Sequence, residues 1–133
     1  MGYRMYAYAH ARDTKNINVL SIADYRNELS VQTPSSSGLI TAMGEVFKNM
    51  KRPAPFIFVW KAEKLIPETL FTTLKRGEEF SLDLRILEID EKGNSRSSFH
   101  FDFAQCSLIK TRILSGRRVK VEATYNYFRK SPD

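Results

Sequence analysis

The chain has 133 residues, of which 42% are hydrophobic and 27% charged. These values are ordinary for a globular protein, so we expect a single domain over residues 1–133. The longest apolar run, FIFVW, is far too short to cross a bilayer, and the N-terminal residues lack the apolar stretch of a signal peptide. We therefore expect no membrane insertion and a protein that starts in the cytoplasm.

The net charge is +6, and the basic excess lies toward the C-terminus. A positive balance suggests nucleic acid or another acidic surface as a partner. Between residues 109 and 130 only Glu122 is acidic. The basic residues of this stretch are Lys110, Arg112, Arg117, Arg118, Lys120, Arg129 and Lys130.

The first part of the chain has strand and loop patterns. Residues 3–9 and 17–22 show the loose alternation and β-branched composition of strands. Residues 25–33 are compatible with a strand or a loop, and PSSSG at 34–38 predicts a loop.

Residues 39–50 leave two interpretations open. Leu39, Met43, Val46 and Met50 recur at helical spacing, which favours an amphipathic helix. Gly44 would cost such a helix about 1 kcal/mol relative to alanine, and the Met-rich composition also suits an extended arm. We expect either a helix or an ordered loop.

The FIFVW run at residues 56–60 is apolar on both sides. In a strand, Phe56, Phe58 and Trp60 point one way, and Ile57 and Val59 point the other. An antiparallel strand with one face in water would instead alternate with polar residues. We expect both faces to be covered, either by a helix of the same chain or by another subunit.

The sequence LIPETLFTTLKRG at residues 65–77 carries start and stop signals of a helix. Pro67 suits the first helical position, Glu68 complements the helix dipole, and Gly77 can take the left-handed conformation that ends a helix. Leu65 and Leu70 have the spacing of a hydrophobic staple. We predict one short helix over about residues 67–76.

The remaining chain predicts further strands. Residues 80–86 alternate until Leu87 shifts the phase, which indicates a bulge, and residues 90–94 suit a hairpin turn. Residues 99–103 and 119–127 alternate again. The fold class is therefore mainly β: a β-barrel or two packed antiparallel sheets, with one short α-helix at its flank.

No pattern of residues names a reaction. Two histidines and one cysteine do not supply a common zinc-site spacing, and no phosphate-binding glycine motif is present. A catalytic triad is suggested by the closeness in sequence of Ser97, Ser98, His100 and Asp102. We interpret these residues instead as polar side chains on the solvent-exposed side of a half-buried strand. Cys106 is expected to be a small buried thiol. We predict no enzyme activity, no catalytic residue, no metal site and no cofactor.

Nucleic-acid binding is harder to set aside. Residues 117–130 interleave basic and aromatic side chains, as barrels that bind single strands do. Tyr125 and Tyr127 are, however, in phase with Val119 and Val121, which places them on the apolar face. For this strand we favour tyrosines in the core and charged residues on the outer face. A barrel of the OB type that binds single-stranded nucleic acid remains the alternative function.

The order of these elements resembles the Hcp (haemolysin-coregulated protein) family of type VI secretion tube proteins. The resemblance is spread over INVLS at 17–21, FIFVWK at 56–61, the helix and its exit at 67–80, the hairpin strands at 80–89 and 97–103, and the final strand at 119–128. The opening D-G-x-G-E-S-type loop of the family is absent, residues 39–50 are more apolar than the usual arm, and the C-terminus is shorter. A divergent member or a related tail-tube-like protein of a contractile system fits this pattern.

The resemblance implies a small β-barrel that forms hexameric rings. Such rings stack into a tube inside a contractile sheath, and the lumen can carry effector cargo. The resemblance implies sheath and spike components as partners. The resemblance also implies export without a signal peptide and no active site. Nucleic acid is a partner only in the alternative interpretation.

Two groups of residues are predicted to serve assembly. The predicted subunit contacts are Leu39, Met43, Val46, Phe47, Met50, Ile57 and Val59. Arg117, Arg118 and Lys120 are predicted to lie near a rim or the lumen, where they would bias which cargo or neighbouring ring is accepted.

Overall fold

A computed structural model of the chain describes residues 2–11, 17–30, 37–61 and 77–131. The strands are β1 (Gly2–Ala11), β2 (Ile17–Ala23), β3 (Glu28–Ser30), β4 (Ala54–Lys61), β5 (Phe80–Ile89), β6 (Ser95–Ile113), β7 (Arg118–Tyr125) and β8 (Tyr127–Ser131). The helix α1 spans Ser37–Asn49, and a 3-10 turn spans Ser115–Arg117. The mainly β prediction is confirmed. The helix predicted at 67–76 lies outside the described residues.

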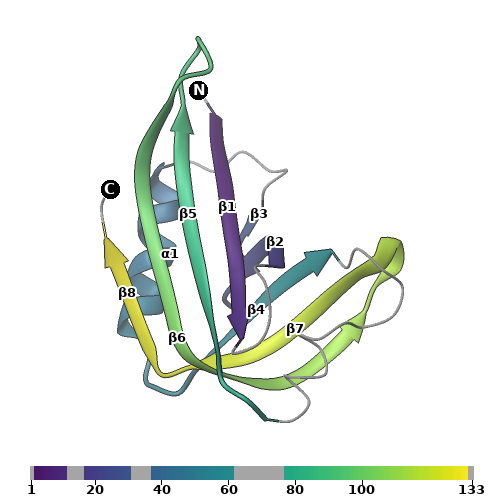
Figure 1. The fold of residues 1–133 in the computed structure, drawn as a ribbon. Helices are drawn as coiled ribbons and strands as arrows, with labels where there is room; N and C mark the ends of the chain where they lie inside the picture. Colours follow the sequence, from purple (N-terminus) through teal and green to yellow (C-terminus); the bar gives the residue numbers. More distant parts are fainter. Residues whose placement is uncertain (1, 12–16, 31–36, 62–76, 132–133) are drawn as a thin grey trace.

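The strands form one curled antiparallel sheet. Their order is β1-β5-β6-β7-β4-β2-β3, with β8 paired to β6. β1 also pairs with β2 through Tyr8↔Asn18 and Ala9↔Ile17, so the sheet curls back toward itself into a half-barrel (Figure 1). β6 joins the two halves of the sheet, because its first part pairs with β5 and β8 and its last part pairs with β7.

A bend in the long strand β6 lets the sheet change direction. Gln105 takes a positive φ of 51° there, and the facing chain breaks at Asn126, whose N–H donates to the Ala104 carbonyl at 3.3 Å. The break shifts the alternation by one residue, so Tyr125 is fully buried whereas Tyr127 is 49% exposed. The prediction that Tyr127 shares the apolar face is therefore wrong, because the strand does not continue through Asn126.

The hairpin between β5 and β6 follows its local sequence. The strand register shifts between Ile86 and Leu87, at the place where a bulge is predicted, but the extra residue is Ser98 of β6 and not a residue of β5. The turn uses Gly93 at a φ of 83°, a conformation that glycine adopts without strain. The Asp90 carboxylate accepts the N–H of Asn94 at 2.8 Å and holds the turn closed.

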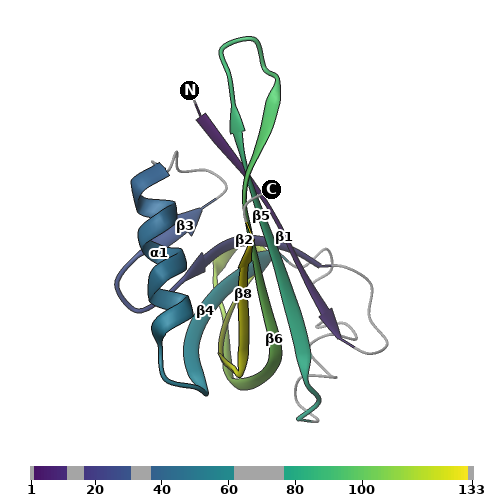
Figure 2. The ribbon, with the colours of Figure 1, turned by 90° about the vertical axis from the view of Figure 1, so that its left-hand side faces the viewer.

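The helix α1 confirms the helical interpretation of residues 39–50. It turns Ile40, Met43, Gly44 and Phe47 toward the sheet, and all of them are buried. Figure 2 shows α1 lying along one side of the curled sheet. The Phe47 ring enters an aromatic cluster, defined here as Phe47, Phe56, Phe101, Phe103, Tyr125 and Phe128. Its closest ring contact is with Phe103, at 5.0 Å between centroids in an edge-on arrangement.

The C-terminal end of α1 is tied to the sheet by hydrogen bonds. The last carbonyls of a helix have no partner within the helix and need another donor. The Tyr125 hydroxyl donates to the Phe47 carbonyl at 2.6 Å. The Arg52 guanidinium donates to the carbonyls of Phe47 and Lys48 at 3.2 and 3.1 Å and lies over the Tyr125 ring.

Gly44 is the point of closest approach between α1 and the sheet. A Cβ at this position would lie 3.0 Å from Cζ of Phe101 and 3.0 Å from Cδ of Lys130. Phe101 is fully buried and has little room to move.

Although alanine favours a helix by about 1 kcal/mol over glycine, we expect Gly44→Ala to lower the free energy of unfolding by about 1–3 kcal/mol through overpacking. Urea denaturation measures this change. Thr41→Ala, on the exposed side of α1, is the control and should be neutral or slightly stabilising; a Gly44→Ala variant as stable as the parent would contradict the prediction.

Tyr125→Phe removes the hydroxyl that joins β7 to α1. We expect the free energy of unfolding to fall by roughly 0.5–1.5 kcal/mol near neutral pH, the usual net contribution of one hydrogen bond. Burial raises the pKa of Tyr125 from 10.0 to about 12. Above pH 10 the unfolded chain ionises first, so the native protein loses stability as the pH rises toward 12. Because the variant lacks this group, the stability gap between the two proteins should narrow in this range, and a constant gap would contradict the assignment.

Candidate functional site

The strand β4 presents two different apolar faces. Phe56 and Phe58 are buried, and Phe56 stacks on Phe103 at 4.9 Å between ring centroids. This is the face on which α1 and the aromatic cluster pack. Ile57 and Val59 point to the opposite side and are only half-buried. Coverage of this second face by another subunit stays a prediction.

An open hollow of about 510 Å³ lies over Ile57 and Val59. Its walls come from β2, the turn into β3, β4 and the hairpin of β6 and β7. The apolar residues of the lining are Leu20, Ala23, Ile57, Val59 and Leu114, together with Tyr25. The charged residues of the lining are Asp24, Arg26, Glu28, Arg118 and Lys120. The hollow therefore combines an apolar patch with charges of both signs.

Asp24 is a buried acid in the lining of the hollow. One carboxylate oxygen, Oδ1, accepts the N–H groups of Arg26 and Asn27 at 2.6 and 2.9 Å and so closes the turn before β3. The other oxygen, Oδ2, is buried and has no hydrogen-bond partner in the described part of the chain. The guanidinium of Arg26 approaches it only to 4.0 Å. The Asp24 side chain is fully buried, so its carboxylate stabilises the turn and is not available to a group that enters the hollow.

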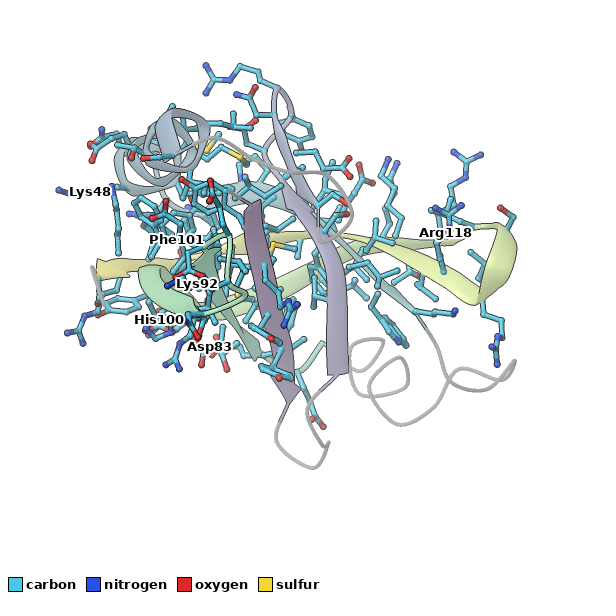
Figure 3. All side chains as sticks on the ribbon, turned by 90° about the horizontal axis from the view of Figure 1, so that it is seen from above. Lys48, Asp83, Lys92, His100, Phe101 and Arg118 are labelled. Atoms are coloured by element: carbon cyan, nitrogen blue, oxygen red, sulfur yellow. The ribbon has the colours of Figure 1, made fainter. Side chains whose placement is uncertain are left out.

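The hairpin of β6 and β7 carries the basic residues at its end. Arg112 and Lys120 face each other in register, and like charges so placed repel. Arg118 donates to the Ser115 carbonyl at 3.0 Å and lies far from His100 and Asp83 (Figure 3). The hairpin also exposes two large apolar side chains, Ile109 at 56% and Ile113 at 69%.

The structure places the predicted basic group at this hairpin. Arg118 and Lys120 line the hollow, and Arg117 lies in the turn with a φ of 61°. Their assignment to a rim or lumen stays a prediction. Ile109 and Ile113 were not singled out from the sequence, because an apolar residue in a strand does not by itself show whether its side is covered.

The predicted contact residues of α1 divide into two sets. Leu39, Val46 and Met50 are half-buried, so part of each side chain is open to a partner. Met43 and Phe47 are fully buried within the chain, where they contact its own core. Helical spacing groups all of these residues on one stripe, and only the packing against the sheet separates them.

A cluster of ionisable residues lies on the outer side of β5 and β6. His100 Nε2 is hydrogen-bonded to Asp83 and lies 3.2 Å from Oδ1 of Asp102. Burial raises the pKa of Asp102, as do the hydrogen bond and charge of Asp83, whereas His100 and Arg129 lower it. Sequence reasoning named His100 and Asp102 and missed Asp83, which the hairpin register brings alongside. Among the described residues, these three groups are the ones that could hold a metal ion.

Cys106 has the environment of a structural thiol. Its side chain is fully buried, which confirms the sequence prediction. Burial raises the pKa of the Cys106 thiol well above its usual value, so the thiol stays protonated and is a poor nucleophile.

Within the described ranges, α1 is neither long nor apolar enough to span a membrane.

Sequence comparison and structure comparison give different results for this chain. No protein-family model matches it, and no curated protein matches it in sequence. Among solved structures it is similar to an Hcp protein, with a TM-score of 0.57 and 11% identity over 98% of this chain and 97% of that one. It is also similar to a variant of the Hcp1 protein from E. coli EAEC 042, with a TM-score of 0.53 and 13% identity over 97% of each chain. The secreted protein Hcp3 from Pseudomonas aeruginosa has a TM-score of 0.53 and 9% identity over 98% of this chain and 97% of that one.

These similarities confirm the resemblance at the level of the fold. The alignments cover nearly the whole of each chain, so the likeness includes the full curled sheet rather than one hairpin.

Proposed function

We propose that this protein is a structural subunit that assembles into rings, which stack into the tube of a type VI-like contractile secretion system. The observation that carries the proposal is the similarity of its fold to Hcp structures over 97–98% of the chain. The proposed ring is a hexamer, as the resemblance implies. Sheath, spike and effector cargo are its proposed partners.

The surface over Ile57 and Val59 supports a contact between neighbouring subunits. Contiguous apolar surface in a soluble protein commonly marks an interaction site. Here the half-buried residues of β4 continue into Leu114 of the hairpin, with Ile113 exposed at its end. α1 packs on the opposite face of β4 and leaves this surface open. A neighbouring copy could therefore cover it without displacing the chain's own core.

The charges around the hollow would orient such a contact. The exposed Glu28 at the hollow favours a lysine or arginine of the neighbouring copy. Arg118 and Lys120 at the same hollow favour an acid. Paired charges of both signs select one register of the two subunits over others. This arrangement suits a repeated, closed contact between identical chains.

A structural role agrees with the chemistry of the described residues. The thiol of Cys106 is buried and protonated, so it does not offer a nucleophile. We propose that the protein works through assembly and through export with the secretion apparatus, without catalysis of its own.

Val59→Asp tests the proposed subunit contact. A carboxylate placed in a contact between subunits is costly when it is desolvated, even beside Lys120, which lies opposite Val59 in register, because the desolvation cost of an ion pair can exceed its attraction. We expect the parent protein to form rings at high concentration, seen by light scattering after size exclusion and by negative-stain imaging. We expect the variant to remain a folded monomer, with an unchanged circular dichroism spectrum.

Asn94→Asp is the matched control for Val59→Asp, since it adds the same charge in the exposed turn between β5 and β6. It should leave the rings intact. A parent protein that stays monomeric at high concentration contradicts the proposed function. Rings that survive Val59→Asp, or a variant that unfolds, contradict the placement of Val59 at a subunit contact.

The single-stranded nucleic-acid alternative has less support from the geometry. Tyr125 is buried and Tyr127 lies beyond the break at Asn126, so the alternating strand does not present a row of aromatic residues beside its basic ones. We expect no detectable binding of a single-stranded oligonucleotide at physiological salt. Salt-sensitive binding that weakens when Arg117 and Arg118 are both changed to Ala would instead favour the alternative.

A further inference from the structure

The outer side of β5 and β6 brings together three metal-ligand side chains from two strands. Asp83 on β5 and Asp102 on β6 are paired directly in register. His100 precedes Asp102 by two residues, so both point to the same side of β6. The intervening Phe101 points to the interior, where it is fully buried. Figure 3 shows His100 and Asp83 beside each other.

The three side chains converge on one point. His100 Nε2 is hydrogen-bonded to Asp83 and lies 3.2 Å from Oδ1 of Asp102. One ligand atom from each residue lies within 4.8 Å of the others. Around a tetrahedral zinc ion, bonds of about 2.0–2.1 Å place neighbouring ligand atoms roughly 3.3 Å apart. A zinc ion could therefore enter with small side-chain movements and no change of the backbone.

Two features of this cluster favour a bound cation. Asp83 and Asp102 lie directly opposite each other across the two strands, and two carboxylates so placed repel when both are ionised. A neutral imidazole has one N–H, so Nε2 can donate to Asp83 or to Asp102 but not fully to both. Arg129 is in register with Asp102, and Arg85 with His100, so both contribute positive charge beside the cluster. These cations stabilise the two carboxylates by their charge, whereas a metal ion in the cluster would also accept the lone pair of His100 Nε2.

We propose that Asp83, His100 and Asp102 form a binding site for a divalent transition-metal ion, with Zn²⁺ as the best match. One nitrogen and two carboxylate oxygens are ligands that zinc accepts, whereas Mg²⁺ and Ca²⁺ prefer oxygen alone. In the bound form, the imidazole carries its proton on Nδ1 and presents the Nε2 lone pair to the ion.

The surroundings leave room for a water molecule as a fourth ligand. A hollow of about 250 Å³ adjoins the cluster and is open to solvent. Its polar lining includes Ser81, Tyr127 and Arg129 as well as both aspartates. The side chains of Asp83 and Asp102 are 45% and 36% exposed, so an ion can reach them from solution. The bound ion would link β5 to β6 on the outer face, and this inference does not depend on the proposed function.

Metal titration of the tag-free, chelator-treated full chain tests the site. We expect one Zn²⁺ per chain by isothermal titration calorimetry. Co²⁺ should give the visible absorption of a four-coordinate site. Asp83→Asn and His100→Asn should each weaken Zn²⁺ binding by about tenfold or more, since even the outer partners of metal ligands commonly contribute that much. Both changes preserve size closely enough to keep the strands paired, which circular dichroism checks.

Glu91→Gln is the matched control for Asp83→Asn, because it also replaces a carboxylate by an amide and lies exposed in the turn between β5 and β6. It should leave Zn²⁺ affinity unchanged. A second measurement is the melting temperature: Zn²⁺ should raise it in the parent and in Glu91→Gln, and much less in the two cluster variants. The proposal is overturned if the parent does not bind Zn²⁺, if Glu91→Gln abolishes binding, or if Asp83→Asn and His100→Asn bind as tightly as the parent.

Discussion

The packing of Phe47 into the aromatic cluster is the interaction on which the other features of this structure depend. The Phe47 ring contacts aromatic residues of β6, β7 and β8, which lie on both sides of the bend in the sheet. The carbonyl of the same residue accepts the Tyr125 hydroxyl. One residue of α1 therefore joins the helix to both halves of the sheet by apolar packing and by a hydrogen bond. The close approach at Gly44 is what allows the helix to lie near enough for these contacts.

This packing on one face decides which surfaces are left open. Because α1 occupies the Phe56 side of β4, Ile57 and Val59 face outward over the hollow. On the other half of the sheet, the outer side of β5 and β6 carries His100 and the two aspartates. The two surfaces differ in chemistry: the first combines apolar residues with charges, which suits a protein partner, and the second concentrates metal-ligand groups, which suits an ion.

Much of the local structure could be predicted from the sequence. The turn at residues 90–94 depends on neighbours in the chain and is confirmed, whereas the register shift after Ile86 comes from an extra residue on the facing strand β6. The chain order of the strands also pointed to the Hcp fold, which structure comparison supports although sequence identity is only 9–13%. A pattern of strands, turns and buried positions can persist at such low identity, because many apolar residues fill one core position about equally well.

What the sequence by itself determined was the set of elements: mainly strands, their turns, an amphipathic segment at 39–50 and a buried Cys106. Alternation and turn residues encode these features within a few positions. Only the tertiary structure decided that Asn126 interrupts the last strand and that Tyr127 points outward. The interruption lies opposite the bend of β6 at Gln105, which the sequence of the last strand does not encode. It also decided that Met43 and Phe47 would fill the core while Ile57 and Val59 remained partly open, since periodicity marks an apolar face without showing what covers it. The meeting of Asp83 with His100 likewise comes from strand register, which brings together residues 17 positions apart.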